Sequence, residues 1–160
     1  MTKSKKSIKS DKFDFMEYLQ LYHNSSFNLY IKDSQLFQSG KGVFTHDFIP
    51  ANTFIDFYQG YLSEHIKGGT YFYQINDTWG IDGFGPPRCY MAMLNDANFQ
   101  ATKIIKKGKK KKILFPHNFV NNCEFIVDEE KLIVSIFSII DIEPESELFI
   151  SYGDTYWTNT

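Results

Sequence analysis

Cysteine is scarce in this chain of 160 residues, which holds only Cys89 and Cys123. Two cysteines cannot build a disulfide scaffold, and neither has metal-ligand neighbours at the spacing of a zinc site. The four histidines are scattered, without the paired spacing that a metal centre needs. We therefore expect no metal and two reduced thiols that pack inside a domain.

Long hydrophobic runs are absent as well. The first residues, Met1 to Lys6, lack the apolar stretch of a secretory signal. The longest apolar stretch, residues 132–140, is interrupted by serines and is about half as long as a membrane span. These absences predict a soluble intracellular protein, nuclear or cytoplasmic, that is not secreted and has no membrane partner.

The formal net charge is only −2, but it conceals a strong asymmetry. Twelve of the 17 basic residues lie in two lysine clusters, five in residues 1–12 and seven in residues 103–112. Of the 19 acidic residues, 18 lie outside these clusters, so the body of the chain is acidic. An acidic body attracts basic ligands, whereas mobile basic arms attract nucleic acid or acidic protein surfaces.

Aromatic residues are abundant, with 16 Phe and 10 Tyr, and they favour half-buried strands. Residues 1–12 are expected to form a disordered basic tail, and residues 13–26 a short segment that is helical over 13–22. A single domain should follow over residues 27–157. Its pattern predicts strands over 27–31, from 43, and over 53–58, 71–75, 132–139 and 149–152, with a helical turn at 90–95. The expected fold class is mostly β, with several short sheets and few helices.

Common catalytic motifs are missing. The turn Gly40-Lys41-Gly42 is no phosphate loop, because that motif needs an earlier glycine and a hydroxyl residue in place of Gly42. No Ser-His-Asp or Cys-His order supports covalent hydrolysis. The turn alone therefore predicts only a tight connection between strands.

Four separated segments nevertheless occur in a characteristic order. They are residues 40–45, 49–60, 90–97 together with 122–125, and 140–153. As an ordered set they resemble the SET domain of protein lysine methyltransferases, over residues 27–157. The compact size and the ending Ser151 to Trp157 look most similar to the minimal SET proteins of large DNA viruses.

The chain also departs from the family pattern, most clearly at residues 95–97 and in the spacing between two of the segments. Residues 95–97 are Asn-Asp-Ala where the family has Asn-His-Ser. A lysine-rich insertion at about 99–117 separates Asn95 from Asn122, which lie only a few residues apart in relatives. It is either a solvated loop or a docking element for nucleic acid phosphates or an acidic protein patch. Because no aromatic residues alternate with the lysines, any nucleic acid contact through Lys103–Lys112 should be non-specific.

The resemblance implies a SET-type fold of several short sheets with a threaded C-terminal segment. It also implies S-adenosylmethionine as cofactor and a lysine amine as methyl acceptor, entering from opposite faces. The catalytic residue implied is Tyr152. Residues lining the lysine channel would be Tyr58, Phe125 and Ile150. Residues binding the cofactor would be Lys41, Gly42, Asn95, Asp96 and Trp157.

Several of these residues have a second interpretation. Tyr58 and Phe125 are equally typical of an aromatic core, and Trp157 would stack on adenine only if it faces the cofactor. For Asp96, which replaces a histidine that mainly uses its backbone, the resemblance implies a main-chain contact.

Two functions remain open at this point. The first is a lysine methyltransferase acting on histone or other Lys-rich tails, whose product should reach di- or trimethyl-lysine because Phe125 and Ile150 lack a hydroxyl. The second is a catalytically weak SET-fold module that binds chromatin or host proteins, favoured by Asp96, Ala97 and the insertion. A homodimer is compatible with either function.

Overall fold

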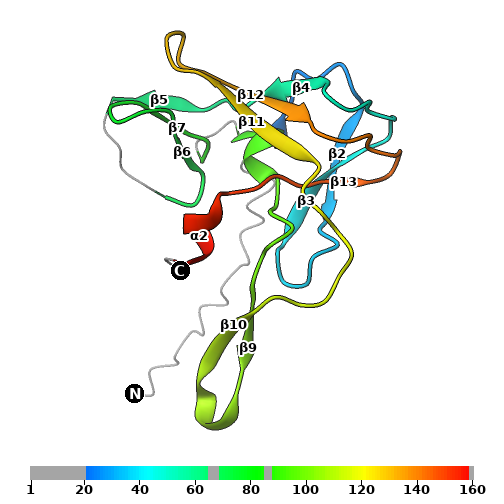
Figure 1. Ribbon diagram of the computed structural model, residues 1–160, viewed down its shortest axis with the longest axis vertical. Helices are drawn as coiled ribbons and strands as arrows, with labels where there is room; N and C mark the ends of the chain where they lie inside the picture. Colours follow the sequence, from blue (N-terminus) through cyan, green and yellow to red (C-terminus); the bar gives the residue numbers. More distant parts are fainter. Residues whose placement is uncertain (1–20, 65–68, 85–87, 159–160) are drawn as a thin grey trace, which may run out of the picture.

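The computed structural model describes residues 21–64, 69–84 and 88–158, and most of the regular structure in these ranges consists of short strands. Three sheets of three strands gather around one core, as Figure 1 shows. The first sheet contains β2 (Leu29–Asp33), β3 (Lys41–Thr45) and β13 (Glu147–Leu148). The second contains β4 (Phe54–Phe57), β12 (Ile133–Ser138) and β11 (Cys123–Asp128). The third contains β5 (Tyr61–Ser63), β7 (Gly80–Asp82) and β6 (Phe72–Gln74).

Two smaller ribbons and three short helices make up the rest of the regular structure in the described ranges. Strand β1 (Leu21–Tyr22) pairs in parallel with β8 (Arg88–Cys89). Strand β9 (Ala101–Ile104) pairs in antiparallel fashion with β10 (Lys110–Ile113). The helices are η1 (Tyr90–Met93), η2 (Lys106–Gly108) and α2 (Asp154–Thr158).

The core lies between the sheets and follows from the two-residue period of the strands. In β12, Val134, Ile136 and Ser138 are buried, whereas Ser135 and Phe137 between them are half-buried. In β3, both Val43 and Phe44 are fully buried, because this strand lies in the middle of its sheet. Both cysteines are free and buried, which confirms the expectation of packed thiols.

After β13 ends, the C-terminal segment passes between the loop at Asn95 and the start of β11. Phe149 bridges to Asn95 and Ile150 bridges to Cys123, both in parallel. The Ile150 amide donates to the Asn95 carbonyl at 2.9 Å, and the Cys123 amide donates to the Phe149 carbonyl at 2.9 Å. This crossing confirms the threaded segment that the resemblance implied. The predicted strand over 149–152 is wrong, because the residues of this segment that pair do so with different neighbours and no continuous ladder forms.

Of the other predicted helices and strands, several are confirmed and one is wrong at its end. Strands β4, β6 and β12 lie inside the segments predicted as strands, and η1 lies inside the predicted helical turn. The helix expected over 13–22 is wrong at its end, because Leu21 and Tyr22 form a strand whose backbone pairs with β8. Residues 1–20, including the basic tail, lie outside the described residues.

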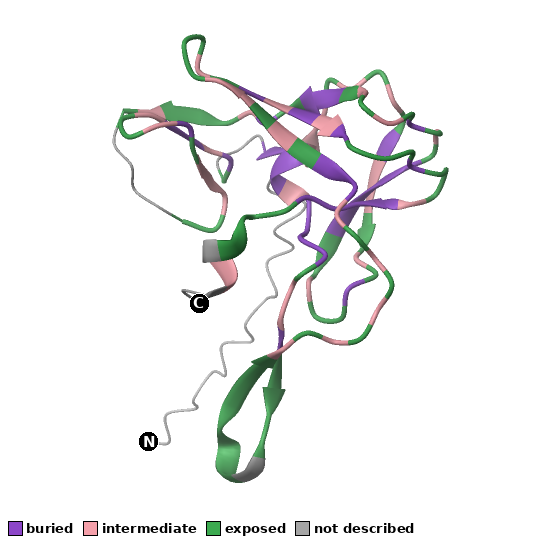
Figure 2. Cartoon of the chain, in the orientation of Figure 1, coloured by how far each residue is buried: buried purple, intermediate pink, exposed green. Residues whose placement is uncertain are grey.

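The insertion is a hairpin, which corrects the expectation of a loop. Strands β9 and β10 project away from the three sheets, and almost the whole hairpin is exposed (Figure 2). Only Ala101, at the base, is buried. Lysine has low strand propensity, so no local pattern predicted these two strands.

Candidate active site

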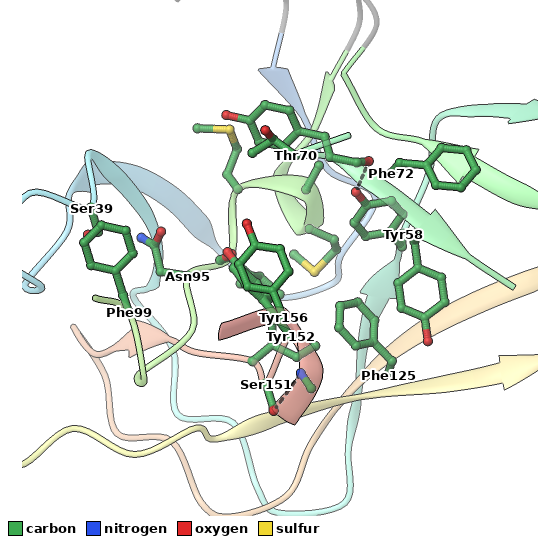
Figure 3. Close-up of a pocket in the computed structure, with 18 of the residues that line it drawn as sticks. Ser39, Tyr58, Thr70, Phe72, Asn95, Phe99, Phe125, Ser151, Tyr152 and Tyr156 are labelled. Atoms are coloured by element: carbon green, nitrogen blue, oxygen red, sulfur yellow. Dashed lines mark hydrogen bonds between the residues drawn. The ribbon is translucent and has the colours of Figure 1, made fainter. Parts of the chain in front are cut away.

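A cavity of about 790 Å³ lies where the threaded C-terminal segment meets η1 and strand β6 (Figure 3). This volume is typical of a site for a small molecule or cofactor. Seven of the nine residues that the sequence indicated line it: Lys41, Tyr58, Asn95, Phe125, Ile150, Tyr152 and Trp157. The other two, Gly42 and Asp96, do not line it but lie directly beside residues that do.

Tyr152 is held in the cavity wall at two points. Its hydroxyl donates a hydrogen bond to the Leu94 carbonyl at 2.5 Å. Its backbone amide donates to the Asp96 carboxylate at 2.9 Å. Because the hydroxyl proton is used by Leu94, the lone pairs of the oxygen remain available to a group in the cavity.

The surroundings of Tyr152 keep its hydroxyl neutral. The residue is still 36% exposed, since it lines an open cavity. Its hydroxyl lies deeper, and burial, followed by the nearby Tyr156 and Asp96, raises the pKa of Tyr152 above its usual value. At neutral pH this hydroxyl can accept and donate hydrogen bonds but carries no charge.

Aromatic rings form a second wall of the cavity. Phe125 lies 4.6 Å from Tyr73 and 6.2 Å from Tyr58, measured between ring centroids. The Tyr58 hydroxyl donates to the Tyr71 carbonyl at 2.5 Å, and burial raises the pKa of Tyr58. These three rings, called the aromatic passage below, line the same cavity as Tyr152. The role of Tyr58 and Phe125 as a channel for the lysine stays a prediction.

Polar groups dominate the opposite part of the cavity, around Asn95. Its side-chain nitrogen donates to the Lys41 carbonyl at 2.9 Å and to the Glu147 carboxylate at 3.2 Å. Both protons of that amide are therefore used, and its oxygen is the atom that can accept from a ligand. Glu147 is 1% exposed and also accepts from the Ser34 hydroxyl at 2.7 Å.

Gly42 makes this arrangement sterically feasible. A Cβ atom at this position would collide with the Glu147 carboxylate and would come within 3.2 Å of the Asn95 side chain. Glycine is therefore required by close approach and not by backbone conformation. The neighbouring Lys41 side chain points outward enough to form an ion pair with Asp33 at 2.5 Å, where both groups are exposed.

Asp96 is a buried hub behind the cavity. It is 1% exposed, and one carboxylate oxygen accepts from the Tyr152 amide and from the Trp157 indole N–H, both at 2.9 Å. Its other oxygen accepts from the Asn98 amide at 2.8 Å and from the Asn121 side chain at 3.0 Å. Asp96 thus positions two cavity-lining residues with its side chain. The contact between its main chain and the cofactor stays a prediction.

Trp157 belongs to α2, which the sequence did not predict, and it forms an edge of the cavity. Its ring stacks on Tyr152 at 5.9 Å and meets Phe99 edge-on at 5.9 Å. The described ranges contain no group of three His, Cys, Asp or Glu residues arranged to hold a metal. Within the same ranges, no helix is long and apolar enough to cross a membrane.

Comparison with known proteins decides the family. The profile of the SET domain matches residues 40–153, which is more than half of the chain. The chain belongs to the SET domain family. A search of curated proteins finds no match to this SET domain.

Many solved structures resemble this SET domain, and two of them are crystal structures of KRYPTONITE. The crystal structure of KRYPTONITE in complex with mCHG DNA and SAH aligns with a TM-score of 0.58 and 20% identity, over 81% of this chain. The crystal structure of KRYPTONITE in complex with mCHH DNA, H3(1-15) peptide and SAH aligns with a TM-score of 0.57 and 19% identity, over 79% of this chain. This chain spans about a quarter of each of those chains, 24% and 23%, and the likeness establishes the fold.

The family confirms two expectations and leaves others as predictions. The mostly β, SET-type fold is confirmed, and S-adenosylmethionine is confirmed as the cofactor at the level of the family. The likeness to viral SET proteins, the cellular location and a homodimer stay predictions.

Sequence reasoning missed several residues of the site. Glu147 and Tyr73 were not singled out, although Glu147 lies in one of the segments that carry the resemblance. Lys112 and Gln100, at the base of the hairpin, also line the cavity. Gly42 was the only feature of the sequence that pointed to its contact with Glu147. No local pattern in the sequence indicated that Tyr73 belongs to the site.

Proposed function

We propose that this SET domain is a protein-lysine N-methyltransferase that uses S-adenosylmethionine and acts on a lysine in a histone-like tail. The observation that carries the proposal is the position of Tyr152. Its hydroxyl lies in one cavity with the polar groups around Asn95 and with the aromatic passage of Tyr58 and Phe125. A methyl donor and a lysine amine need such a meeting point.

The residues of the polar part fit the cofactor. S-adenosylmethionine carries an ammonium, a carboxylate and an adenine ring, and it supplies a methyl group bound to a positive sulfonium. The Asn95 oxygen, left over after both amide protons are used, suits the ammonium. Among the described residues, Lys41 pairs with the exposed Asp33 alone, and it suits the carboxylate. Phe99 and Trp157 offer aromatic surface for adenine.

The aromatic passage would prepare the lysine for attack. A lysine amine must lose its proton before it can act as a nucleophile. Burial between apolar rings, and the approach of a positive cofactor, both lower an amine's pKa. Tyr152 orients the neutral amine through its free lone pairs, and positioning of this kind supplies a large part of the acceleration in a displacement reaction.

The charge of the chain supports a basic substrate. Apart from its two lysine clusters, the chain contains 18 of its 19 acidic residues, and such a body attracts Lys-rich peptides. One of the two KRYPTONITE structures is a complex with an H3(1-15) peptide. Both points support a histone or histone-like tail as substrate.

Replacing the Tyr152 hydroxyl tests the proposal. We expect Tyr152→Phe to bind the cofactor normally in a calorimetric titration but to lose about 100-fold or more in methyl transfer, as for a missing transition-state hydrogen-bonding group. The free energy of unfolding should change by only about 1 kcal/mol, since a single hydrogen bond is removed. Transfer is measured with labelled cofactor on histone proteins.

The matched control is Tyr156→Phe, which removes a hydroxyl from a ring 5.0 Å away in the same cavity. We expect its rate to stay within a few-fold of the wild type. Equal rates for wild type and Tyr152→Phe would overturn the assignment of Tyr152.

A catalytically weak binding module is the second candidate, and the Asn-Asp-Ala sequence at residues 95–97 favours it. The buried carboxylate of Asp96 counts against it, because that group orders Tyr152 and Trp157. Calorimetric titration with the cofactor distinguishes the two functions. A binding module of this kind would bind histone tails yet show no heat of cofactor binding.

A further inference from the structure

The lysine-rich hairpin is the most exposed regular element of the described chain. Strands β9 and β10 form an antiparallel ribbon in which Lys111 lies opposite Lys103 and Lys112 lies opposite Thr102. The ribbon stands clear of the three sheets (Figures 1 and 2). Because side chains alternate along a strand, Lys110 and Lys112 point to one face and Lys111 to the other. Both faces of the ribbon therefore carry positive charge.

This charge has no compensation within the hairpin. No acidic residue occurs between Asp96 and Glu124. The ion pairs seen among the described residues involve Lys41, His46 and Lys131, and none involves a hairpin lysine. Like charges directly opposite each other, as in Lys103 and Lys111, destabilise a strand pair. A polyanion on the ribbon would relieve that repulsion.

We propose that this hairpin is a docking surface for double-stranded DNA. A two-stranded ribbon is one of the elements that the major groove of a B-form duplex admits. Lysines on both faces of such a ribbon can reach the phosphates on both sides of the groove. The contacts would carry no base specificity, because lysine binds phosphate as a point charge.

Duplex nucleic acid fits the hairpin better than the other polyanions do. Single strands are bound by stacking their bases on aromatic rings, and residues 101–113 contain no aromatic residue. The core of a protein interface is depleted in lysine and enriched in aromatic residues, and the hairpin has the opposite composition. An acidic protein is therefore the less suitable partner.

The position of the hairpin has a consequence that rests on the proposed function. Lys112, at the base of the hairpin, lines the cavity that holds Tyr152. A duplex on the outer part of the ribbon would therefore lie near this cavity. A basic tail that is itself bound on the same duplex would be brought close to the site.

Binding of a labelled DNA duplex of about 20 base pairs and random sequence tests the proposal without any use of activity. The variant replaces Lys103, Lys109, Lys110 and Lys111 with Gln and retains Lys112, since that side chain belongs to the cavity. We expect the affinity, measured by fluorescence anisotropy at low salt, to fall at least about tenfold. The slope of log affinity against log salt should become shallower by about 0.9 for each phosphate that the variant no longer neutralises.

The matched control replaces Lys3, Lys5, Lys6 and Lys9 with Gln, which removes the same charge from residues 1–12. We expect this variant to retain clearly more affinity than the hairpin variant. Unchanged circular dichroism and unchanged cofactor binding would show that both variants are folded.

Three results would overturn the proposal. The first is an equal fall in affinity in both variants, which would show that only net charge matters. The second is competition by poly-glutamate as strong as that by unlabelled duplex, which would assign the hairpin to acidic proteins. The third is equal affinity for a single strand of the same length. A loss of methyl transfer on a free peptide with normal duplex binding would instead concern the proposed enzymatic function alone.

Discussion

The two ends of the active-site cavity are built by different means. Around Asn95, hydrogen bonds and close contacts to buried carboxylates hold each group, and nearly every donor has one specific acceptor. Around Phe125, rings pack against one another at centroid distances of 4.6 and 6.2 Å, with few directional contacts. The first end demands particular residue types, whereas the second demands mainly apolar volume.

This difference predicts how each end responds to substitution. Unsatisfied buried donors cost about 1–3 kcal/mol each, and overpacking costs a similar amount. Changes in the size or polarity of a ring at an open cavity cost less, because the neighbouring side chains can adjust. The polar end should therefore control whether the protein folds and binds cofactor, and the aromatic end should control what the reaction produces.

Removing the Asp96 carboxylate should have the largest effect. In Asp96→Ala the Tyr152 amide, the Trp157 indole and two further donors are left without their acceptor. We expect the free energy of unfolding to fall by about 3 kcal/mol and methyl transfer to be abolished. Chemical denaturation followed by Trp fluorescence measures the first effect.

Asp96→Asn is the matched control, since its single side-chain oxygen can serve only one pair of donors. It should lie between the wild type and the Ala variant in both stability and activity. If Asp96→Ala unfolds at the same denaturant concentration as the wild type, the hub has no structural role.

A methyl group at Gly42 should have the next largest effect. Gly42→Ala places a Cβ against the Glu147 carboxylate, which is itself buried. We expect stability to fall by about 2 kcal/mol and cofactor binding to weaken at least about tenfold, since Asn95 must shift with Glu147. Calorimetric titration with S-adenosylmethionine measures the affinity.

Gly108→Ala is a useful control, because nothing lies within 4 Å of its added Cβ although its φ is +72°, and because this residue of the hairpin does not line the cavity. This variant should be destabilised by a comparable amount through backbone strain but keep its affinity for the cofactor. Equal affinities for all three proteins would show that close packing at Gly42 does not shape the cofactor end.

The motifs of the site could be anticipated from the sequence much better than the contacts behind them. Tyr152, Asn95 and Phe125 lie in segments whose order identifies the SET domain, so their place in the cavity could be expected. The contact between Gly42 and Glu147 spans more than a hundred positions in the chain, and no local period encodes it. The same holds for Asp96, whose change from the family's histidine looked like a loss but supplies acceptors to four donors.

The fold was anticipated to a similar extent. Alternating apolar residues predicted β12 and β4, because one face of each strand is buried and the other is not. The two strands of the hairpin were not predicted, because they are rich in lysine and have no buried face along most of their length. Strands β1 and β8 are two residues long, which is too short for any periodicity to appear.

A hydroxyl added at the aromatic end should have the smallest effect on stability and a clear effect on the product. Phe125 and Ile150 both lack a hydroxyl, so a methylated amine has room to turn and react again, and we expect di- or trimethyl-lysine from the wild type. Phe125→Tyr adds an oxygen that can hydrogen-bond the amine or hold a water in that space. One such bond is worth about 1 kcal/mol, which corresponds to a shift of about fivefold toward monomethyl product.

Tyr73→Phe, which removes an oxygen from the ring 4.6 Å away, should not move the product in that direction. Mass spectrometry of the methylated peptide separates the products, and a wild type that stops at monomethyl-lysine would contradict this account of the passage.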